Sequence, residues 1–184
     1  MNLYTTEFPV LASTEGIAFE IYLAGCRGHC YDCHSKHTWN FEAGTPLNGK
    51  DELLNLISEL EDKKNLFDNV AILGGEPLDH NKEDLLNFLF YLSARFPFHD
   101  FYLYTHYKES YVKKIWSEIL PFLNFVKVGE YNNRKKNDDF KKDPLTGVTL
   151  ASTNQYFIEG KREFGKKFKE EVYNRRNGVL NHDG

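Results

Sequence analysis

The chain has 184 residues, of which 41% are hydrophobic and 27% charged, and its formal net charge at pH 7 is -4. This length and composition predict one folded domain spanning residues 1–184 and exclude a disordered chain. The negative charge argues against direct nucleic-acid binding, and no apolar run approaches the roughly 20 residues that cross a bilayer. Because the N-terminus also lacks the basic start and apolar core of a signal peptide, we expect a cytoplasmic protein.

Strand and helix patterns alternate along the chain. The predicted strands cover residues 17–25, 70–73, 101–105 and 125–129. The predicted helices between them cover residues 51–61, 82–96 and 109–119, and a proline follows or ends the last two. This order of short apolar strands and helices predicts an α/β fold with a mainly parallel sheet and right-handed crossovers.

The pattern weakens after Gly129. Residues 130–150 are polar and rich in charge, and we expect an ordered but irregular excursion there, with a turn at DPLTG. The stretch STNQYFIEG is compatible with one more strand. The basic tail over residues 161–184 is expected to be partly helical and frayed at its end.

All three cysteines lie in one short stretch, GCRGHCYDCHSKHT, as Cys26, Cys30 and Cys33. In a reducing compartment this CxxxCxxC spacing favours metal or redox chemistry over disulfides. Thiolates select zinc or iron and sulfide. One alternative is a structural Cys3His zinc site, completed by His29, His34 or His37. The other is a [4Fe-4S] cluster with one iron free of protein ligands, and the spacing favours it because all ligands come from one loop.

A second unusual stretch, GGEP, occupies residues 74–77 at the end of a predicted strand. Gly74 and Gly75 let the backbone approach a ligand closely, Glu76 is an acceptor for an ammonium group, and Pro77 fixes the exit of the turn. Taken alone, such a sequence is more often only a tight turn. Ligands collect at the carboxyl ends of parallel strands, so the cysteine loop and GGEP are expected to face one pocket.

Several stretches resemble one known superfamily: LAGCRGHCYDCHSKHTW, AILGGEPL, YLYTHYKES, the DPL turn and STNQ. Between residues 17 and 157 these stretches run in the order found in radical S-adenosylmethionine (SAM) enzymes. Within that superfamily they resemble most closely the small activases of anaerobic ribonucleotide reductases. The resemblance implies a partial (β/α) barrel with a [4Fe-4S] cluster and SAM as cofactors. It also implies that SAM is cleaved to a 5'-deoxyadenosyl radical with an electron from reduced flavodoxin or ferredoxin. The radical would then act on a glycine of the reductase large subunit.

The resemblance also implies roles for individual residues. Cys26, Cys30 and Cys33 would hold the cluster. The expected SAM contacts are Gly74, Gly75, Glu76 and Pro77 around the amino group, and Asp32, Cys33 and His34 beside the adenine. No catalytic side chain beyond this site is implied. A radical SAM enzyme acting on a small molecule, such as a deazapurine synthase, is an alternative within the same chemistry.

The chain departs from the family pattern at several places, including Leu150-Ala151, where the family has Arg-Gly before the serine of its late motif. The family's Pro-Gly before the third cysteine is here Tyr31-Asp32, and the aromatic residue after that cysteine is His34. The family's threonine-glycine-tyrosine appears as Thr105-His106-Tyr107, where His106 is expected to have a structural role more often than a ligand contact. The run from Arg134 to Lys136 is either a solvated loop or a patch for an acidic partner.

Overall fold

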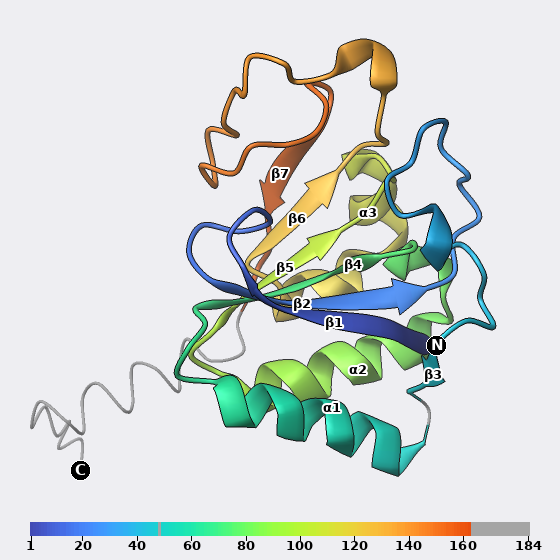
Figure 1. The fold of residues 1–184 in the computed structure, drawn as a ribbon, viewed down its shortest axis with the longest axis vertical. Helices are drawn as coiled ribbons and strands as arrows, with labels where there is room; N and C mark the ends of the chain where they lie inside the picture. The colour runs from blue at the N-terminus through green and yellow to red at the C-terminus, as the bar shows by residue number, and fades with distance from the viewer. Residues whose placement is uncertain (48, 163–184) are drawn as a thin grey trace, which may run out of the picture.

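The computed structural model describes residues 1–47 and 49–162, which form a sheet with helices packed on one face (Figure 1). Seven strands lie in the order β3-β1-β2-β4-β5-β6-β7. The strands are β1 Asn2–Val10, β2 Ala18–Ala24, β3 Thr45–Pro46, β4 Asn69–Gly74, β5 Asp100–Tyr104, β6 Phe125–Val128 and β7 Tyr156–Glu159. The α-helices are α1 Lys50–Lys63, α2 Lys82–Arg95 and α3 Glu109–Ile115. Most of the expected basic tail, from residue 163 onward, lies outside the described residues.

The centre of the sheet is parallel, as the sequence predicts. Strands β2, β4, β5 and β6 pair in parallel, with Ile72 of β4 opposite Ile21 on one side and Leu103 on the other. At the edges, β1, β3 and β7 pair in antiparallel fashion. The fold is therefore α/β with a mixed sheet, and β1 is an element that the sequence analysis did not foresee.

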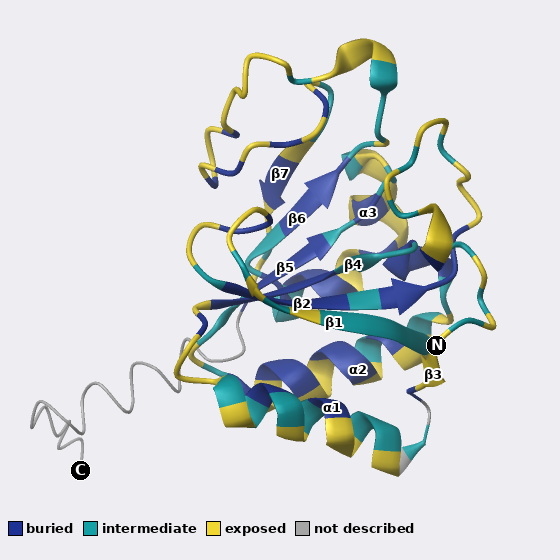
Figure 2. Ribbon diagram, in the orientation of Figure 1, coloured by how far each residue is buried: buried dark blue, intermediate teal, exposed yellow. Residues whose placement is uncertain are grey.

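The two faces of the sheet are covered differently. On one face, side chains such as Phe19, Ile21 and Leu23 join a large core with α1 and α2, whose inner surfaces are buried and outer surfaces exposed (Figure 2). On the other face, Val148 and Leu150 from the expected excursion pack against strand residues. The excursion is thus ordered and lies partly over the sheet.

Local signals explain where the helices begin and end. The side chain of Asn81 accepts hydrogen bonds from the backbone N–H groups of Glu83 and Asp84, which caps α2 close to its predicted start. The helix predicted over residues 109–119 is shorter, because a 3₁₀ turn over Ser117–Phe122 follows α3. Pro121 lies in that turn and lacks the N–H group that an α-helix needs.

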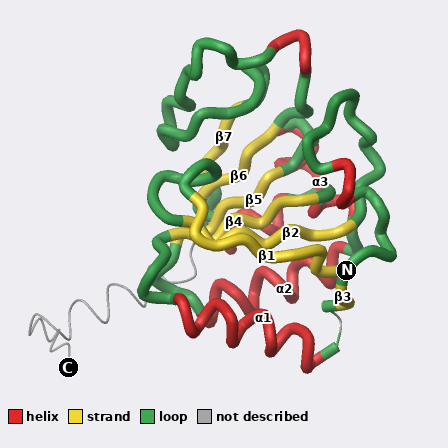
Figure 3. The backbone as a smooth tube through the Cα atoms, viewed as in Figure 1, coloured by secondary structure: helices red, strands yellow, loops and turns green. Residues whose placement is uncertain are grey.

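The loops that follow the parallel strands gather at one end of the sheet (Figure 3). The cysteine loop follows β2, the GGEP turn follows β4, and Thr105 and Gly129 follow β5 and β6. Within residues 1–47 and 49–162, no helix combines the length and the apolar character needed to cross a bilayer.

Candidate functional site

The cysteine loop begins and ends on neighbouring backbone. Gly25, directly after β2, donates its N–H to the carbonyl of Thr38 at 2.6 Å, and Cys26 donates to the carbonyl of Trp39 at 3.1 Å. These two bonds close residues 25–39 into one loop at its neck. Cys26 is buried near that neck, whereas Cys30 and Cys33 are half-buried further out, and all three thiols are free.

The three cysteines line one cleft of about 170 Å³ at the carboxyl ends of the central strands. Its lining also includes Gly74, Gly75 and Glu76 of the GGE turn and, from the loop after β5 and from β6, Thr105, His106 and Lys127. The structure thus brings together the two loops that the sequence analysis placed in one pocket. Three further predicted contact residues, Asp32, His34 and Pro77, are not part of this lining.

The thiols in the cleft and the N–H groups that donate to them fit an iron–sulfur cluster. Backbone N–H groups of Gly28 and Ser35 donate to the sulfurs of Cys26 and Cys33 at 3.3 and 3.4 Å, and such bonds help to set the potential of a cluster. Burial raises the pKa of the Cys30 thiol, and the two neighbouring cysteines raise it further. Iron bound among the thiolates relieves this mutual repulsion, since a metal favours the deprotonated ligand.

Each of the three histidines in the cysteine loop packs against an aromatic ring. The ring of His29 packs on Trp39 with centroids 4.5 Å apart, and those of His37 and His34 pack on tyrosines at 5.1 and 5.2 Å. Among the residues that the structure describes, no group of three or more His, Cys, Asp or Glu side chains is drawn together tightly enough for a metal ion.

The GGE turn is bonded to the cysteine loop through the backbone. Gly75 donates to the carbonyl of Leu23 at 2.7 Å, and Glu76 donates to that of Gly25 at 2.8 Å. A Cβ atom on Gly75 would lie 2.2 Å from the Gly25 oxygen, and Gly74 has a φ of +107°. The two glycines are needed here because β-carbons would not fit where the loops meet.

Gly75→Ala is expected to destabilise the protein by about 1–3 kcal/mol, because the new methyl group overlaps the backbone of Gly25. The displaced cysteine loop should also bind less iron. Thermal unfolding and iron content after anaerobic reconstitution measure the two effects. Gly147→Ala is the matched control. Gly147 also has a positive φ, +72°, so alanine strains the backbone there, but the new methyl group would meet no neighbouring atom. The iron content of this variant should equal that of the wild type. Normal iron content in Gly75→Ala would contradict the expectation.

Glu76 is the centre of a hydrogen-bond network and is only 1% exposed. Its Oε1 accepts from Thr105 Oγ1 at 2.7 Å and from the backbone of Leu78 at 3.0 Å. Its Oε2 accepts from the backbone N–H of His106 and lies 2.8 Å from His106 Nδ1. Burial lowers the pKa of His106, but hydrogen bonds to Cys26 and Glu76 outweigh it and raise the pKa to about 10.

Lys127 is a site residue that the sequence analysis missed. Its side chain is buried in the cleft, and Nζ donates to the carbonyl of Gly129 at 3.0 Å. Burial lowers its pKa to about 8, against the opposing effect of Glu76 and of the Cys30 and Cys33 thiols. In the sequence, the one feature that could have indicated this site residue is a lysine inside the short, otherwise apolar strand FVKV.

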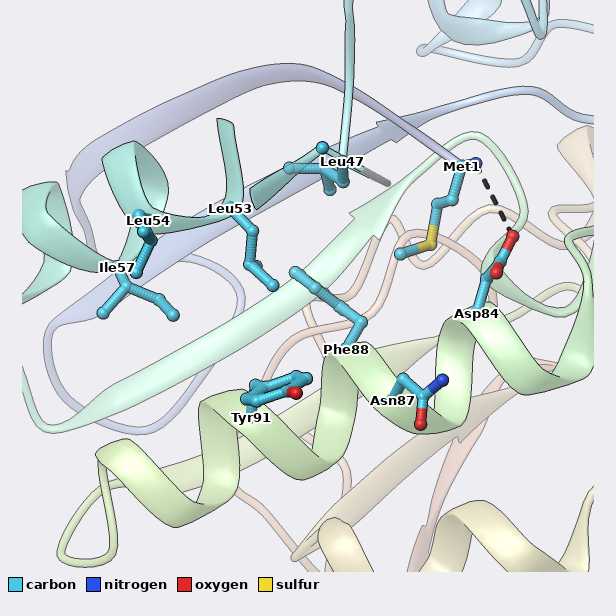
Figure 4. A pocket seen from close by; sticks show the side chains of 10 residues that line it. Met1, Leu47, Leu53, Leu54, Ile57, Asp84, Asn87, Phe88 and Tyr91 are labelled. Carbon is cyan, nitrogen blue, oxygen red and sulfur yellow. Dashed lines mark ion pairs between the residues drawn. The ribbon is translucent and has the colours of Figure 1, made fainter. Parts of the chain in front are cut away.

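A second hollow, of about 420 Å³, lies between α1, α2 and the N-terminus (Figure 4). Leucine, isoleucine, phenylalanine and tyrosine side chains line most of it, with Asp84 and Asn87 near one end. It contains no cysteine or histidine.

Comparisons with known proteins agree with this site. Residues 12–148 match the family of 4Fe-4S single cluster domains, which makes the chain an iron–sulfur protein. It is 30% identical over 130 residues to the anaerobic ribonucleoside-triphosphate reductase-activating protein of Enterobacteria phage T4, covering 69% of this chain and 77% of that protein. It is 27% identical over 118 residues to the protein of the same name from Haemophilus influenzae, covering 64% and 76%. The chain belongs to the family of anaerobic ribonucleoside-triphosphate reductase-activating proteins, which are radical SAM enzymes.

A more local similarity points to a related enzyme. The chain is 41% identical over 58 residues to the 7-carboxy-7-deazaguanine synthase of Hyperthermus butylicus, which covers 32% of this chain and 22% of that protein. The two activating proteins match over about three quarters of their own length. The family assignment therefore follows them.

Proposed function

We propose that the chain cleaves SAM reductively at a [4Fe-4S] cluster and installs a glycyl radical on the large subunit of an anaerobic ribonucleotide reductase. The observation that carries the proposal is the shared cleft, in which three cysteines of one loop face the GGE turn at adjoining strand ends. The names of the two activating proteins support the reductase as the partner.

In this proposal Cys26, Cys30 and Cys33 hold the cluster and leave one iron open to the amino and carboxylate groups of SAM. When bound, the cluster would supply one electron, received from an external donor, for reductive cleavage of SAM to methionine and a 5'-deoxyadenosyl radical, which would take a hydrogen atom from the partner's glycine. The chain's own residues bind SAM, orient it and keep water away.

The GGE turn would bind the amino group of SAM through the backbone of Gly74 and Gly75 and the carboxylate of Glu76, with Pro77 fixing the turn. All four acceptor positions of that carboxylate already have partners, so an ammonium group must share or displace the contact with His106 Nδ1. Glu76 thus has two roles in the proposal: it accepts from the ligand and it holds the end of β5.

Lys127 places a cation in the same cleft, and we propose that it binds the carboxylate of SAM. Asp32 and His34 are proposed beside the adenine. Both lie exposed on the cysteine loop, where Asp32 has a φ of +61° and the ring of His34 packs on Tyr131.

We also propose that residues 1–184 form one domain whose sheet is a partial (β/α) barrel, with reduced flavodoxin or ferredoxin as the electron donor. The parallel strands β2, β4, β5 and β6 support the barrel, because the cleft lies at their carboxyl ends. The resemblance to radical SAM enzymes supports the class of donor.

Electron paramagnetic resonance tests the proposed substrate. After the reconstituted protein is mixed with SAM, a reductant and the large subunit of the cognate reductase, a glycyl doublet is expected on the reductase. SAM cleavage without the doublet would favour a small-molecule enzyme, in line with the local similarity to the deazaguanine synthase. Failure to bind about four irons per chain, together with failure to cleave SAM, would contradict the whole proposal.

A further inference from the structure

Asp79 connects the GGE turn to the cysteine loop and to the loop after β5. It is the last residue of the 3₁₀ turn over Pro77–Asp79, which begins directly after Glu76, and it is only 5% exposed. Its Oδ2 accepts a hydrogen bond from the backbone N–H of Arg27 at 2.6 Å, and its Oδ1 accepts one from the hydroxyl of Tyr107 at 2.7 Å. One buried carboxylate therefore joins the segments that follow β2, β4 and β5.

The contact with Arg27 acts on the backbone next to Cys26. The N–H of Cys26 donates to the carbonyl of Trp39 at 3.1 Å, and the N–H of the following residue donates to Asp79. The guanidinium of Arg27 lies over the ring of Phe41, 5.3 Å from its centroid. The two peptide groups that flank Cys26 are therefore both held, one by the neck of the loop and the other by Asp79.

The two carboxylates of this short turn occupy different places. Glu76 lines the cleft, whereas Asp79 is not part of the lining and lies behind it. Burying a carboxylate costs free energy unless its oxygens accept hydrogen bonds, and both oxygens of Asp79 have a donor. Any effect of Asp79 on a group bound in the cleft must therefore pass through the residues to which it is bonded.

We propose that Asp79 is a positioning residue that holds Cys26 in place for cluster ligation by accepting the hydrogen bond from the N–H of Arg27. A thiolate on a fixed backbone returns to iron more readily after a transient break, because less conformational entropy is lost when it binds again. The contact should therefore slow the loss of iron. The inference rests on the proposed function only in placing a cluster on these cysteines.

The test follows the loss of iron to a chelator from the anaerobically reconstituted wild type, Asp79→Asn and Asp79→Leu. Leucine has a similar size but no acceptor, and this variant should lose iron at least about tenfold faster, given what a hydrogen bond to a charged group contributes. Asparagine keeps an acceptor for the Arg27 N–H, and its amide can donate to the oxygen of Tyr107. The rate for Asp79→Asn should therefore lie closer to that of the wild type. If Asp79→Leu does not fold, Asp79→Ala takes its place, because it removes the acceptor without adding bulk.

Asp143→Leu is the matched control. Asp143 is also buried, and its carboxylate accepts from the backbone N–H groups of Leu145, Thr146 and Phe157, none of which lies in the cysteine loop. This variant should unfold at a lower temperature but lose iron at the rate of the wild type. Equal acceleration of iron loss in Asp79→Leu and Asp143→Leu would overturn the inference, since general destabilisation would then be the cause.

Hydrogen exchange of the Arg27 amide in the cluster-free protein tests the contact without a metal. The amide should exchange slowly in the wild type and Asp79→Asn, and faster in Asp79→Leu. Iron loss from Asp79→Leu at the rate of the wild type, or from Asp79→Asn as fast as from Asp79→Leu, would overturn the inference alone. A wild-type protein that binds no cluster but shows this pattern of exchange would contradict the proposed function while supporting the role of Asp79 in fixing the loop.

Discussion

Replacement of Cys30 by alanine is expected to abolish SAM cleavage completely. The three cysteines of the loop line the cleft together, and the loss of one thiolate leaves the proposed cluster with two protein ligands. The measurements are iron content, visible absorbance after anaerobic reconstitution, and chromatography of the 5'-deoxyadenosine formed with dithionite. Retention of cleavage in Cys30→Ala would contradict the ligand assignment.

His37→Ala is the matched control for that experiment. His37 lies in the same loop but packs on Tyr4, so its removal should leave cleavage and iron content close to those of the wild type. Equal loss in Cys30→Ala and His37→Ala would instead indicate a Cys3His zinc site. Metal analysis for zinc and iron on both variants distinguishes the two cases.

Lys127→Met is expected to weaken SAM binding by at least about tenfold while raising the melting temperature. A hydrogen bond to a charged group contributes about 1.5–3 kcal/mol, which sets the scale of the lost affinity. Lys127 is buried and has no ion pair among the described residues, so replacing it with an apolar side chain of similar size removes the cost of a buried charge. Isothermal titration with SAM and thermal unfolding measure the two effects. Lys135→Met, at an exposed position, is the control.

The pH dependence of this variant has a definite sign. Burial lowers the pKa of Lys127 from 10.5 to about 8 in the folded protein. Between these values the unfolded chain holds the proton that the folded chain has lost, so the stability of the wild type rises with pH. The stability advantage of Lys127→Met should therefore shrink over that range, and SAM binding by the wild type should weaken as pH rises through about 8. A constant difference in stability would contradict the assignment of a buried charge.

The sequence predicted the parts of the site that are local. The cysteine loop, the GGEP turn and the start of α2 each depend on neighbouring residues, and the parallel order of the central strands follows from their alternation with helices. By contrast, the sequence analysis missed β1. This strand pairs with β2 in antiparallel fashion near the edge of the sheet, and most of its residues are only partly buried. Its sequence therefore lacks the fully apolar character of the central strands.

The remaining site residues could not be predicted because their contacts join distant strands. Glu76 meets Thr105 and His106 only because β4 and β5 are neighbours and end at the same level. Lys127 faces the cleft because of the alternation within β6, which a four-residue strand is too short to reveal by periodicity. The polar composition of residues 130–150 likewise concealed that Val148 and Leu150 cover part of the sheet.

The closed neck of the cysteine loop separates the folding of the sheet from assembly of the cluster. The bonds at Gly25 and Cys26 join backbone to backbone and involve no cysteine sulfur, so closing the ends of this segment does not depend on a metal ligand. Cluster insertion then has to order only the residues between the two ends. A chelator that removes the iron should accordingly leave a folded chain that can be reloaded, unlike small zinc domains that unfold when their metal is lost.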